Sequence, residues 1–411
     1  MRAEILAVGS ELLMPGRVET NASYLTTRLL EIGIAVGARI TVADDHALLE
    51  SAFRTALGRA DIVFATGGLG PTEDDLTREA AARALGRGLR RDPALIDALK
   101  ARFARYGRVM APVNEKQADV IEGAVVLPND RGTAPGQRVD VGTGALFLLP
   151  GPPSEMQPMF EEQARPWLQA RAGGRVIRTH VLKIAGMSES EVEQKVAPIY
   201  KTFENPRTTI LSHPGLVELY FVADGDAADT VARIEALAAP VREALGDAIF
   251  SEDGRELPEV VAALLTERRL TVSFAESCTG GLATARLTDI PGASAFLDRA
   301  FVTYSNRSKV DELGVPAELL ERHGAVSEEV AREMARGARR VAGADIGAAI
   351  TGIAGPDGGT AEKPVGLVWF ALDGAAGERT RRVQFVGSRD RVRYQATQAV
   401  FDMIRKGLLR S

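Results

Sequence analysis

The sequence is poor in several residue types, and each shortage removes a class of protein. Its 411 residues include a single cysteine, Cys278, so the chain can form no internal disulfide, which suits a reducing cytoplasm. No apolar run approaches the ~20 residues that a membrane-spanning helix needs. The formal net charge is −5, which does not indicate nucleic acid or an acidic membrane as a partner. We therefore expect a soluble, cytoplasmic protein.

The remaining composition is that of a folded protein with several domains. Apolar residues make up 45% of the chain and charged residues 26%, as in soluble globular proteins. The length exceeds one ordinary core and suggests two or three domains. The first apolar run ends at Val8 and carries Glu4, so we interpret it as a first β-strand and not as a signal peptide.

Residues 1–172 and 254–411 share one pattern, in which short β-branched runs alternate with amphipathic segments. Such alternation predicts βαβ units on parallel sheets. The predicted strands of the first segment are Glu4–Val8, Ala35–Ala43, Ile62–Thr66 and Ala145–Leu149, and its predicted helices are Asn21–Ile32, His46–Leu57, Asp75–Leu85 and Pro93–Tyr106. Residues 173–253 have antiparallel character instead. The predicted fold class is α/β, with two α/β domains of largely parallel sheets joined by a small α+β domain.

The first polar loop, residues 66–75, lies between a buried strand and a helix. In open parallel sheets, ligands bind beyond such strand ends. Its three glycines let the backbone approach a phosphate, and the helix start supplies N–H groups. Two adjacent carboxylates, Asp74 and Asp75, would repel a phosphate unless a divalent cation lies between, or unless one of them caps the helix. A plain glycine turn with acidic capping residues stays open for this loop alone.

Further polar segments are expected at the same edge of the sheet. Glu11 follows the first strand, and loops at 114–117 and 129–136 add polar residues. With Leu149–Pro153, these segments resemble the molybdopterin-binding-type (MoaB/MogA-like) domain that opens competence/damage-inducible CinA proteins. The resemblance covers residues 1 to about 170 and implies ADP-ribose pyrophosphatase activity with a divalent metal (Mg, Mn or Co). The residues it implies are Gly67, Gly68, Gly70 and Thr72 for the phosphates, and Asp74, Asp75 and Glu11 for the metal.

A second polar loop carries three adjacent candidate nucleophiles, Ser277, Cys278 and Thr279. A turn with Thr279 as helix cap and Cys278 as a small buried residue would explain it without chemistry. The one histidine of residues 254–411, His323, fits a helix end, so a Ser–His–Asp arrangement is not expected. Another base is then needed. Lys309, about one turn into the helix after the next strand, is the candidate, provided that its pKa is lowered.

Three polar or glycine-rich loops of this last segment follow strands, which favours one pocket at one sheet edge. The loops, 275–281, 304–306 and 351–356, resemble the C-terminal domain of CinA proteins, whose standalone versions are the PncC-type nicotinamide mononucleotide amidohydrolases. The resemblance runs from about 256 to 408. The roles it implies are Ser277 as nucleophile, Lys309 as general base, Tyr304 in the same polar network, and Ser294, Thr351 and Arg389 in substrate positioning.

The chemistry of amide hydrolysis fits these roles and needs no cofactor. Backbone N–H groups near Gly280 and Gly281 would bind the oxyanion. Because adjacent residues of an extended chain point to opposite sides, only one of Ser277 and Cys278 faces the pocket. Geometry alone does not say which, and the family resemblance favours Ser277.

Residues 173–253 fall where this family carries a KH-like module. A KH clamp on single-stranded nucleic acid uses a Gly-x-x-Gly loop, and the nearest candidate, Gly186–Glu189, lacks the second glycine and adds an acid. We expect a spacer or dimerisation element, a homodimer, and no binding to nucleic acid or membrane.

The whole chain is then predicted to be a bifunctional enzyme of pyridine-nucleotide salvage that acts on nicotinamide mononucleotide and ADP-ribose. Two alternatives stay open. One is a deamidase whose first domain only binds a nucleotide or pterin, and the other is a non-enzymatic competence or DNA-repair adaptor.

Overall fold

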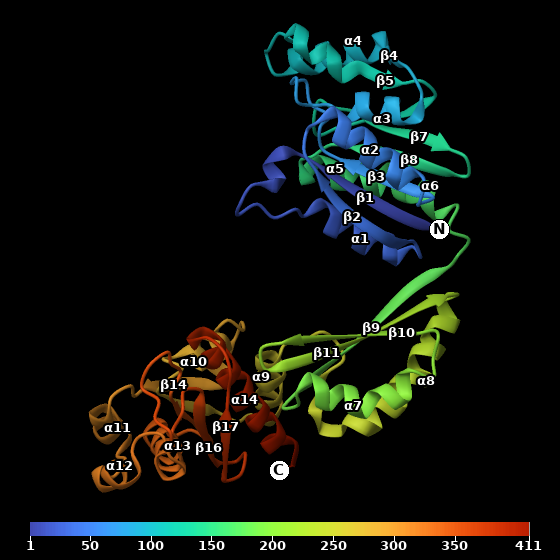
Figure 1. Ribbon diagram of the computed structural model, residues 1–411. Helices are drawn as coiled ribbons and strands as arrows, with labels where there is room; N and C mark the ends of the chain where they lie inside the picture. Colours follow the sequence, from blue (N-terminus) through green and yellow to red (C-terminus); the bar gives the residue numbers. More distant parts are fainter. Residues whose placement is uncertain (411) are drawn as a thin grey trace. The chain divides into compact units, whose positions relative to one another are not determined.

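The computed structural model describes residues 1–410 (Figure 1). By its internal packing the chain divides into two compact units, Met1–Arg178 with Ala223–Arg233, and Thr179–Val222 with Ile234–Ser411. Within residues 1–410, no helix is both long and apolar enough to cross a membrane.

The first unit is built on a six-stranded sheet in the order β2-β1-β3-β8-β7-β6. Its strands are β1 (Arg2–Val8), β2 (Ala35–Val42), β3 (Ile62–Thr66), β6 (Ala124–Leu127), β7 (Gly136–Val141) and β8 (Gly144–Leu149). The first four in spatial order are parallel, and β7 and β6 add an antiparallel edge. Two short strands, β4 (Leu89–Arg91) and β5 (Asp119–Ile121), pair separately.

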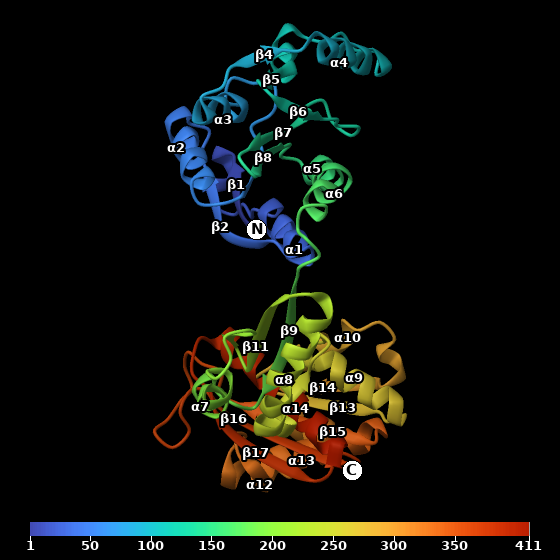
Figure 2. The ribbon, with the colours of Figure 1, turned by 90° about the vertical axis from the view of Figure 1, so that its right-hand side faces the viewer.

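Helices cover both faces of this sheet (Figure 2). The α-helices are α1 (Asn21–Glu31), α2 (His46–Leu57), α3 (Thr77–Leu85), α4 (Pro93–Arg105), α5 (Pro153–Met159) and α6 (Arg165–Gln169), and the short turns are η1 (Ser10–Leu13), η2 (Pro112–Ala118) and η3 (Phe160–Ala164). One core joins α1, α5 and α6 to the sheet, and another joins α2 and α3 to its other face. Every residue of β3 is buried, as expected for a central parallel strand.

The register brings three loops to one edge of the first sheet. Ala7 is the register partner of Thr66, and Thr66 is the register partner of Leu149. Strands β1, β3 and β8 therefore end at the same edge of the sheet. The loops that follow these strands therefore meet at their carboxyl ends, where ligands bind in open α/β sheets.

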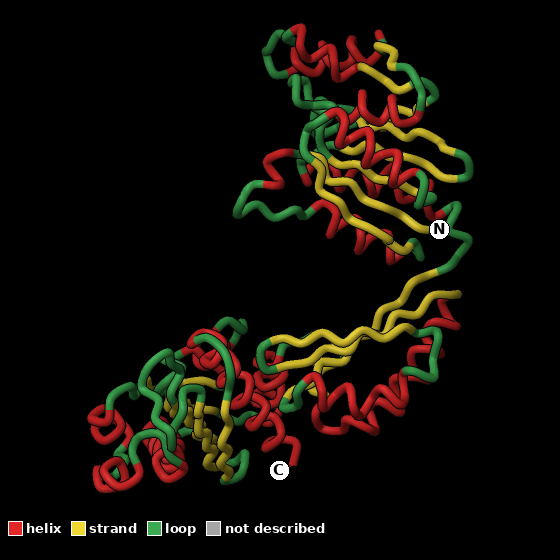
Figure 3. The backbone as a smooth tube through the Cα atoms, viewed as in Figure 1, coloured by secondary structure: helices red, strands yellow, loops and turns green. Residues whose placement is uncertain are grey.

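The middle segment is a four-stranded sheet, in the order β10-β11-β9-β12, with helices on one face (Figure 3). Its elements are β9 (Val176–Ala185), α7 (Glu189–Tyr200), β10 (Arg207–His213), β11 (Leu216–Gly225), α8 (Ala227–Leu245), η4 (Gly246–Ala248) and β12 (Ile249–Ser251). The predicted capping box at the start of α7 is confirmed, since Ser188 and Glu191 satisfy each other's backbone N–H groups.

The C-terminal sheet has the order β14-β13-β15-β16-β17. Its strands are β13 (Val272–Glu276), β14 (Leu297–Val302), β15 (Ile346–Gly352), β16 (Leu367–Gly374) and β17 (Arg379–Gln384). The helices are α9 (Leu257–Arg268), α10 (Leu282–Thr288), α11 (Asn306–Leu313), α12 (Ala317–His323), α13 (Glu328–Ala342) and α14 (Arg389–Arg410), with a short turn η5 (Ala293–Ala295). One core packs α9, α10 and α14 on one face, and another packs α13 on the opposite face.

The predicted fold class is confirmed, with mixed sheets that are parallel at their centres. The strands β14, β13 and β15 are parallel, and Glu276 is level with both Val302 and Ile350. The predicted helix at Asp75–Leu85 begins two residues later, at Thr77, because Asp75 belongs to the preceding loop. The strands β4 to β7 were not predicted, because they are short or lie on an antiparallel edge where apolar patterning is weak.

Candidate functional sites

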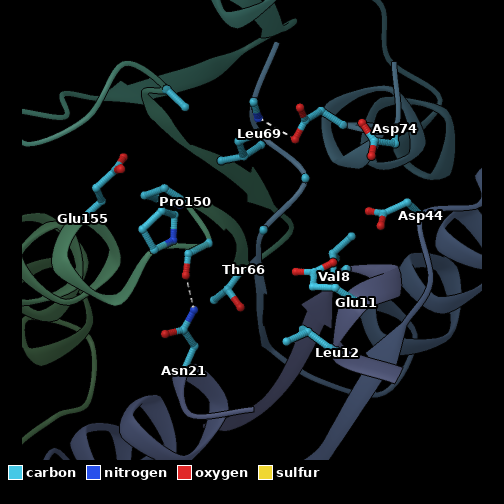
Figure 4. A pocket seen from close by; sticks show the side chains of 18 of the residues that line it. Val8, Glu11, Leu12, Asn21, Asp44, Thr66, Leu69, Asp74, Pro150 and Glu155 are labelled. Carbon is cyan, nitrogen blue, oxygen red and sulfur yellow. Dashed lines mark hydrogen bonds between the residues drawn. The ribbon is translucent and has the colours of Figure 1, made fainter. Parts of the chain in front are cut away.

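A cavity of about 510 Å³ opens at the strand-end edge of the first sheet (Figure 4). All seven residues predicted for the first site line it: Glu11, Gly67, Gly68, Gly70, Thr72, Asp74 and Asp75. Figure 4 shows Glu11, Asp44 and Asp74 on one side, and Asn21 and Glu155 on the other. The structure therefore brings these predicted residues into one space.

The glycine loop after β3 turns its carbonyl groups toward α3. Thr77 Oγ1 donates to the Gly67 carbonyl oxygen at 2.8 Å, and Arg78 donates to the carbonyl oxygens of Leu69 at 2.9 Å and Gly70 at 3.0 Å. Within residues 1–410, the amide groups of Gly68 and Leu69 donate to no other protein group. A loop with its carbonyls held and its amides free can bind an anion.

Glycine is required at the start of this loop. Gly67 has a φ of 100°, and a Cβ there would lie 2.2 Å from the Val8 carbonyl oxygen. Any side chain would therefore collide with β1 and push the loop from the sheet edge.

The two adjacent aspartates have different surroundings. Asp75 accepts hydrogen bonds from the Gly70 amide at 2.7 Å, the Thr72 amide at 2.8 Å and the Thr72 hydroxyl at 2.5 Å, so it organises the loop. Asp74 is exposed, and the nearby Thr72 hydroxyl, its own backbone N–H and the charge of Lys116 hold its pKa below the ordinary value. Asp74 thus keeps an ionised carboxylate at the cavity, whereas Asp75 has both oxygens occupied.

The carboxylates suit a hard divalent cation, although they form no closed metal cage. Glu11, Asp44 and Asp74 line the same cavity, yet residues 1–410 hold no group of three or more ligating side chains placed to share one ion. Mg²⁺ commonly uses one or two carboxylates and takes its other ligands from phosphates and water. The donor set fits that mode, and the metal assignment of Asp74, Asp75 and Glu11 stays a prediction.

Asp44 was missed by the sequence reasoning. It follows β2, which runs parallel to β1, so the rule of strand ends could have found it. Its carboxylate accepts a hydrogen bond from the Ser10 amide at 2.6 Å, which ties the loops after β1 and β2 together.

The second site pairs a serine with a buried lysine. Lys309 on α11 places its Nζ 3.1 Å from Ser277 Oγ and 2.7 Å from the Thr303 carbonyl oxygen. The lysine side chain is 1% exposed, and this burial lowers its pKa from 10.5 to about 8. No carboxylate pairs with its amine in residues 1–410, so a substantial neutral fraction exists near physiological pH.

The cysteine beside the serine faces the other way. Cys278 packs in the hydrophobic core with residues of α9, α14 and the sheet, and burial raises the pKa of its thiol to about 12. Ser277 is the residue of the pair whose side chain contacts Lys309. The two side chains lie on opposite sides of the chain, and the structure places Ser277 at the lysine.

Free backbone amides follow the serine. The Gly280 amide donates to the Ser277 carbonyl oxygen at 3.1 Å, and both Gly280 and Gly281 have positive φ, 61° and 90°. The amides of Thr279 and Gly281 donate to no other protein group within residues 1–410. These are donors of the kind that bind an oxyanion.

The remaining predicted residues have more varied positions. The Tyr304 hydroxyl accepts a hydrogen bond from Arg389 at 2.9 Å, and Arg389 also donates to the Gly355 carbonyl oxygen at 2.8 Å. No hydrogen bond in residues 1–410 joins Tyr304 to Ser277 or Lys309. Thr351 is buried and donates to the Ala325 carbonyl oxygen at 2.8 Å.

Ser294 is exposed in the short turn η5, and its hydroxyl makes no hydrogen bond within residues 1–410. Nothing in the structure joins it to Ser277, and its positioning role stays a prediction.

Sequence reasoning missed Glu276, which precedes the serine. It is fully buried, and its carboxylate accepts from the amides of Ala283 at 3.1 Å and Thr284 at 2.8 Å, and from the Thr284 hydroxyl at 2.7 Å. Glu276 thereby joins the end of β13 to the start of α10 and fixes the loop between them. An acidic residue at the end of a buried strand, directly before the candidate nucleophile, was the available clue.

Comparison with known proteins covers nearly the whole chain. Residues 4–170 match the probable molybdopterin binding domain, 179–251 the damage-inducible protein CinA KH domain, and 254–408 the CinA C-terminal domain. A CinA-like protein of Solibacter usitatus is 45% identical over 412 residues, which cover 99% of this chain and 98% of that protein.

A second relative and a solved structure are also similar to this chain. A putative competence-damage inducible protein of Symbiobacterium thermophilum is 46% identical over 424 residues, covering 100% of this chain and 99% of that protein. A solved structure of a CinA superfamily protein from Klebsiella pneumoniae has 38% identity, with a TM-score of 0.37, and covers 38% of this chain and 100% of its own.

Proposed function

Because this chain belongs to the CinA family of competence/damage-inducible proteins, we propose that it is a hydrolase with two separate sites for pyridine nucleotides and their fragments. The C-terminal site hydrolyses the carboxamide of nicotinamide mononucleotide to nicotinate mononucleotide and ammonia. The single observation that carries this proposal is the 3.1 Å contact between Lys309 Nζ and Ser277 Oγ, with a lysine pKa of about 8.

The acylation step uses the serine and the lysine together. Neutral Lys309 takes the proton of Ser277 Oγ as that oxygen bonds to the carboxamide carbon. The free amides of Thr279 and Gly281 bind the resulting oxyanion. Lys309 then returns the proton to the departing nitrogen, the C–N bond breaks, and ammonia leaves an acyl ester on Ser277.

The deacylation step repeats the proton transfers with water. Lys309 removes a proton from the attacking water, whose oxygen bonds to the acyl carbon. The ester bond breaks, Ser277 Oγ recovers the proton, and the product carboxylic acid ionises. Arg389, at the start of α14, supports binding of the phosphate at the other end of the substrate.

Ammonia release from nicotinamide mononucleotide tests this proposal. We expect activity in the native protein and in Cys278→Ala, and its loss in Ser277→Ala and Lys309→Ala. Loss in Cys278→Ala with activity kept in Ser277→Ala would move the nucleophile by one residue. No ammonia from the native protein would overturn the deamidase assignment.

The N-terminal site is proposed to cleave ADP-ribose to AMP and ribose 5-phosphate. The supporting observation is the 510 Å³ cavity that combines the free amides of the glycine loop with exposed Asp74. A bound divalent metal would neutralise charge on the diphosphate. Asp74, Glu11 and Asp44 would hold that metal through their carboxylates, and the amides of Gly68 and Leu69 would hold a phosphate.

Metal-dependent release of AMP tests the second activity. We expect AMP with Mg²⁺ or Mn²⁺ and none with a chelator, and a reduced rate in Asp74→Asn. Binding of ADP-ribose without cleavage would contradict this proposal and would mean that the first domain only binds nucleotides.

A further inference from the structure

Helix α14 contacts the turn after Ser277 through one arginine, Arg393. The Nη2 and Nε atoms of Arg393 donate to the Thr279 carbonyl oxygen at 2.8 and 3.3 Å. The Arg393 side chain is 30% exposed, so most of it is covered by protein. Because the two residues are 114 positions apart, the contact ties the last helix of the chain to the loop that carries the proposed nucleophile.

No strong ion pair competes for this arginine. Within residues 1–410 its one acidic partner is Asp390, whose Oδ1 lies 3.9 Å from Arg393 Nη1 and whose side chain is 93% exposed. An exposed pair at that distance contributes little. Both side-chain hydrogen bonds of Arg393 in the same residues go to the Thr279 carbonyl oxygen. The carbonyl of Thr279, and not a neighbouring acid, therefore sets the position of the guanidinium group.

The carbonyl that Arg393 holds belongs to the central peptide of the turn. A peptide unit is planar, so the Thr279 carbonyl and the Gly280 N–H move together. The Gly280 N–H donates to the Ser277 carbonyl oxygen at 3.1 Å. The plane is thus held at both of its polar groups, and the free amides of Thr279 and Gly281 lie on either side of it along the chain.

Without the arginine, little else would hold this plane. Both glycines of the turn have positive φ, 61° and 90°, and glycine adopts either sign of φ. A regular helix start would bond the Thr279 carbonyl to the Ala283 amide, but that amide donates to Glu276 at 3.1 Å. The Leu282 amide also donates to the Thr279 carbonyl, at 3.3 Å. The charged donor of Arg393 is closer, and charge-assisted hydrogen bonds are the stronger kind.

We propose that Arg393 is a positioning residue for hydrolysis at Ser277, an inference that rests on the proposed deamidase function. By fixing the peptide between residues 279 and 280, it keeps the free amides of the turn in place for the oxyanion before the substrate binds. Arg389 lies one turn earlier on the same face of α14 and contacts Gly355 and Tyr304 instead. The two arginines thus have separate tasks, and Arg393 acts through the turn and not on the substrate.

Amide hydrogen exchange of the full-length protein, resolved to single residues by mass spectrometry, tests the contact without relying on activity. We expect the Gly280 amide to exchange at least about tenfold faster in Arg393→Met than in the native protein, because the charge-assisted hydrogen bond that holds its peptide is lost. The control is Arg391→Met on the same helix, since the exposed Arg391 side chain forms no hydrogen bond or ion pair within residues 1–410. Unchanged exchange at Gly280 in Arg393→Met would overturn the proposal.

Steady-state ammonia release separates positioning from substrate binding. Arg393→Met should lower kcat about tenfold or more while KM for nicotinamide mononucleotide stays within about threefold, because the oxyanion exists only after the substrate is bound. Arg393→Lys, which keeps a charged donor, should lie between Arg393→Met and the native protein, and Asp390→Asn and Arg391→Met should change neither constant. A raised KM with kcat unchanged would make Arg393 a ligand of the substrate and overturn the proposal.

Two outcomes are kept apart by using both measurements. If the native protein releases no ammonia, the deamidase assignment fails, and the exchange at Gly280 still decides whether Arg393 orders the turn. If Arg393→Met does not fold, Arg393→Gln, whose shorter side chain withdraws the charged donor from Thr279, takes its place in both measurements with the same expected changes.

Discussion

The pH dependence of ammonia release should follow the ionisation of Lys309. The base must be neutral, and burial places its pKa at about 8, compared with 10.5 for an ordinary lysine. At pH 7 about one lysine in ten is then neutral, compared with roughly one in three thousand at the ordinary pKa. Burial thus raises the reactive fraction about three-hundredfold, which corresponds to about 3 kcal/mol.

The assay is kcat/KM for nicotinamide mononucleotide between pH 6.5 and about 9.5, above the second phosphate pKa of ≈ 6. We expect a tenfold rise per pH unit up to about 8 and a plateau beyond it, because a single deprotonation activates the base. Cys278→Ala should give the same curve, since its thiol has a pKa of about 12. A flat profile, or one whose rise moves in Cys278→Ala, would refute the role of Lys309.

The same shift has a consequence for stability. Because the folded-state pKa lies below the unfolded one, the unfolded chain binds the extra proton between pH 8 and 10.5, and stability rises with pH across that window. Between pH 8 and 10, the melting temperature of the native protein should therefore rise relative to that of Lys309→Met. Parallel curves for the two proteins would mean that the lysine is not desolvated in solution.

Three further predictions concern the residues that shape the two loops. Asp75→Asn should lower both the melting temperature and ADP-ribose cleavage, because an amide cannot accept all three hydrogen bonds, whereas Asp74→Asn should lower only cleavage and leave melting unchanged. Glu276→Gln should destabilise the protein by about 1–3 kcal/mol and lower kcat for ammonia release more than it changes KM, measured by denaturant unfolding and steady-state kinetics. Arg78→Met should weaken ADP-ribose binding in calorimetry while ammonia release stays unchanged, and an equal loss of both would point to general unfolding.

Much of the second site could be predicted because parallel strands end together. Once residues 272–276, 297–302 and 346–352 are parallel neighbours, the residues that follow them must meet at one edge. That is why Ser277 and Lys309, which are 32 positions apart, could be paired from sequence and lie 3.1 Å apart. The two central strands, β13 and β15, are buried almost throughout, and such runs are visible in the sequence.

Side-chain direction and hydrogen-bond use could not be predicted in the same way. Residue geometry alone did not separate Ser277 from Cys278, and only the family resemblance favoured Ser277; in the structure Ser277 contacts Lys309 and Cys278 packs in the core. Likewise Asp74 and Asp75 are the same residue type, and only the path of the loop makes Asp75 accept from Gly70 and Thr72. Such differences depend on the path of the backbone through each loop, which residue patterns do not record.

The two loops have a common design that explains why charged residues are buried beside them. In the first, Arg78 is fully buried and holds the carbonyl groups of Leu69 and Gly70, so the loop amides stay free for phosphate. In the second, Glu276 is fully buried and occupies amides at the start of α10, so the helix is fixed while the amides of the preceding turn stay free. The sign of the buried charge follows from the groups it must hold: a cation for carbonyls and an anion for amides. A charged residue buried beside a strand-to-helix glycine loop therefore indicates which backbone groups it holds in place, and exchanging Arg78 or Glu276 for a neutral residue should disturb only the site beside it.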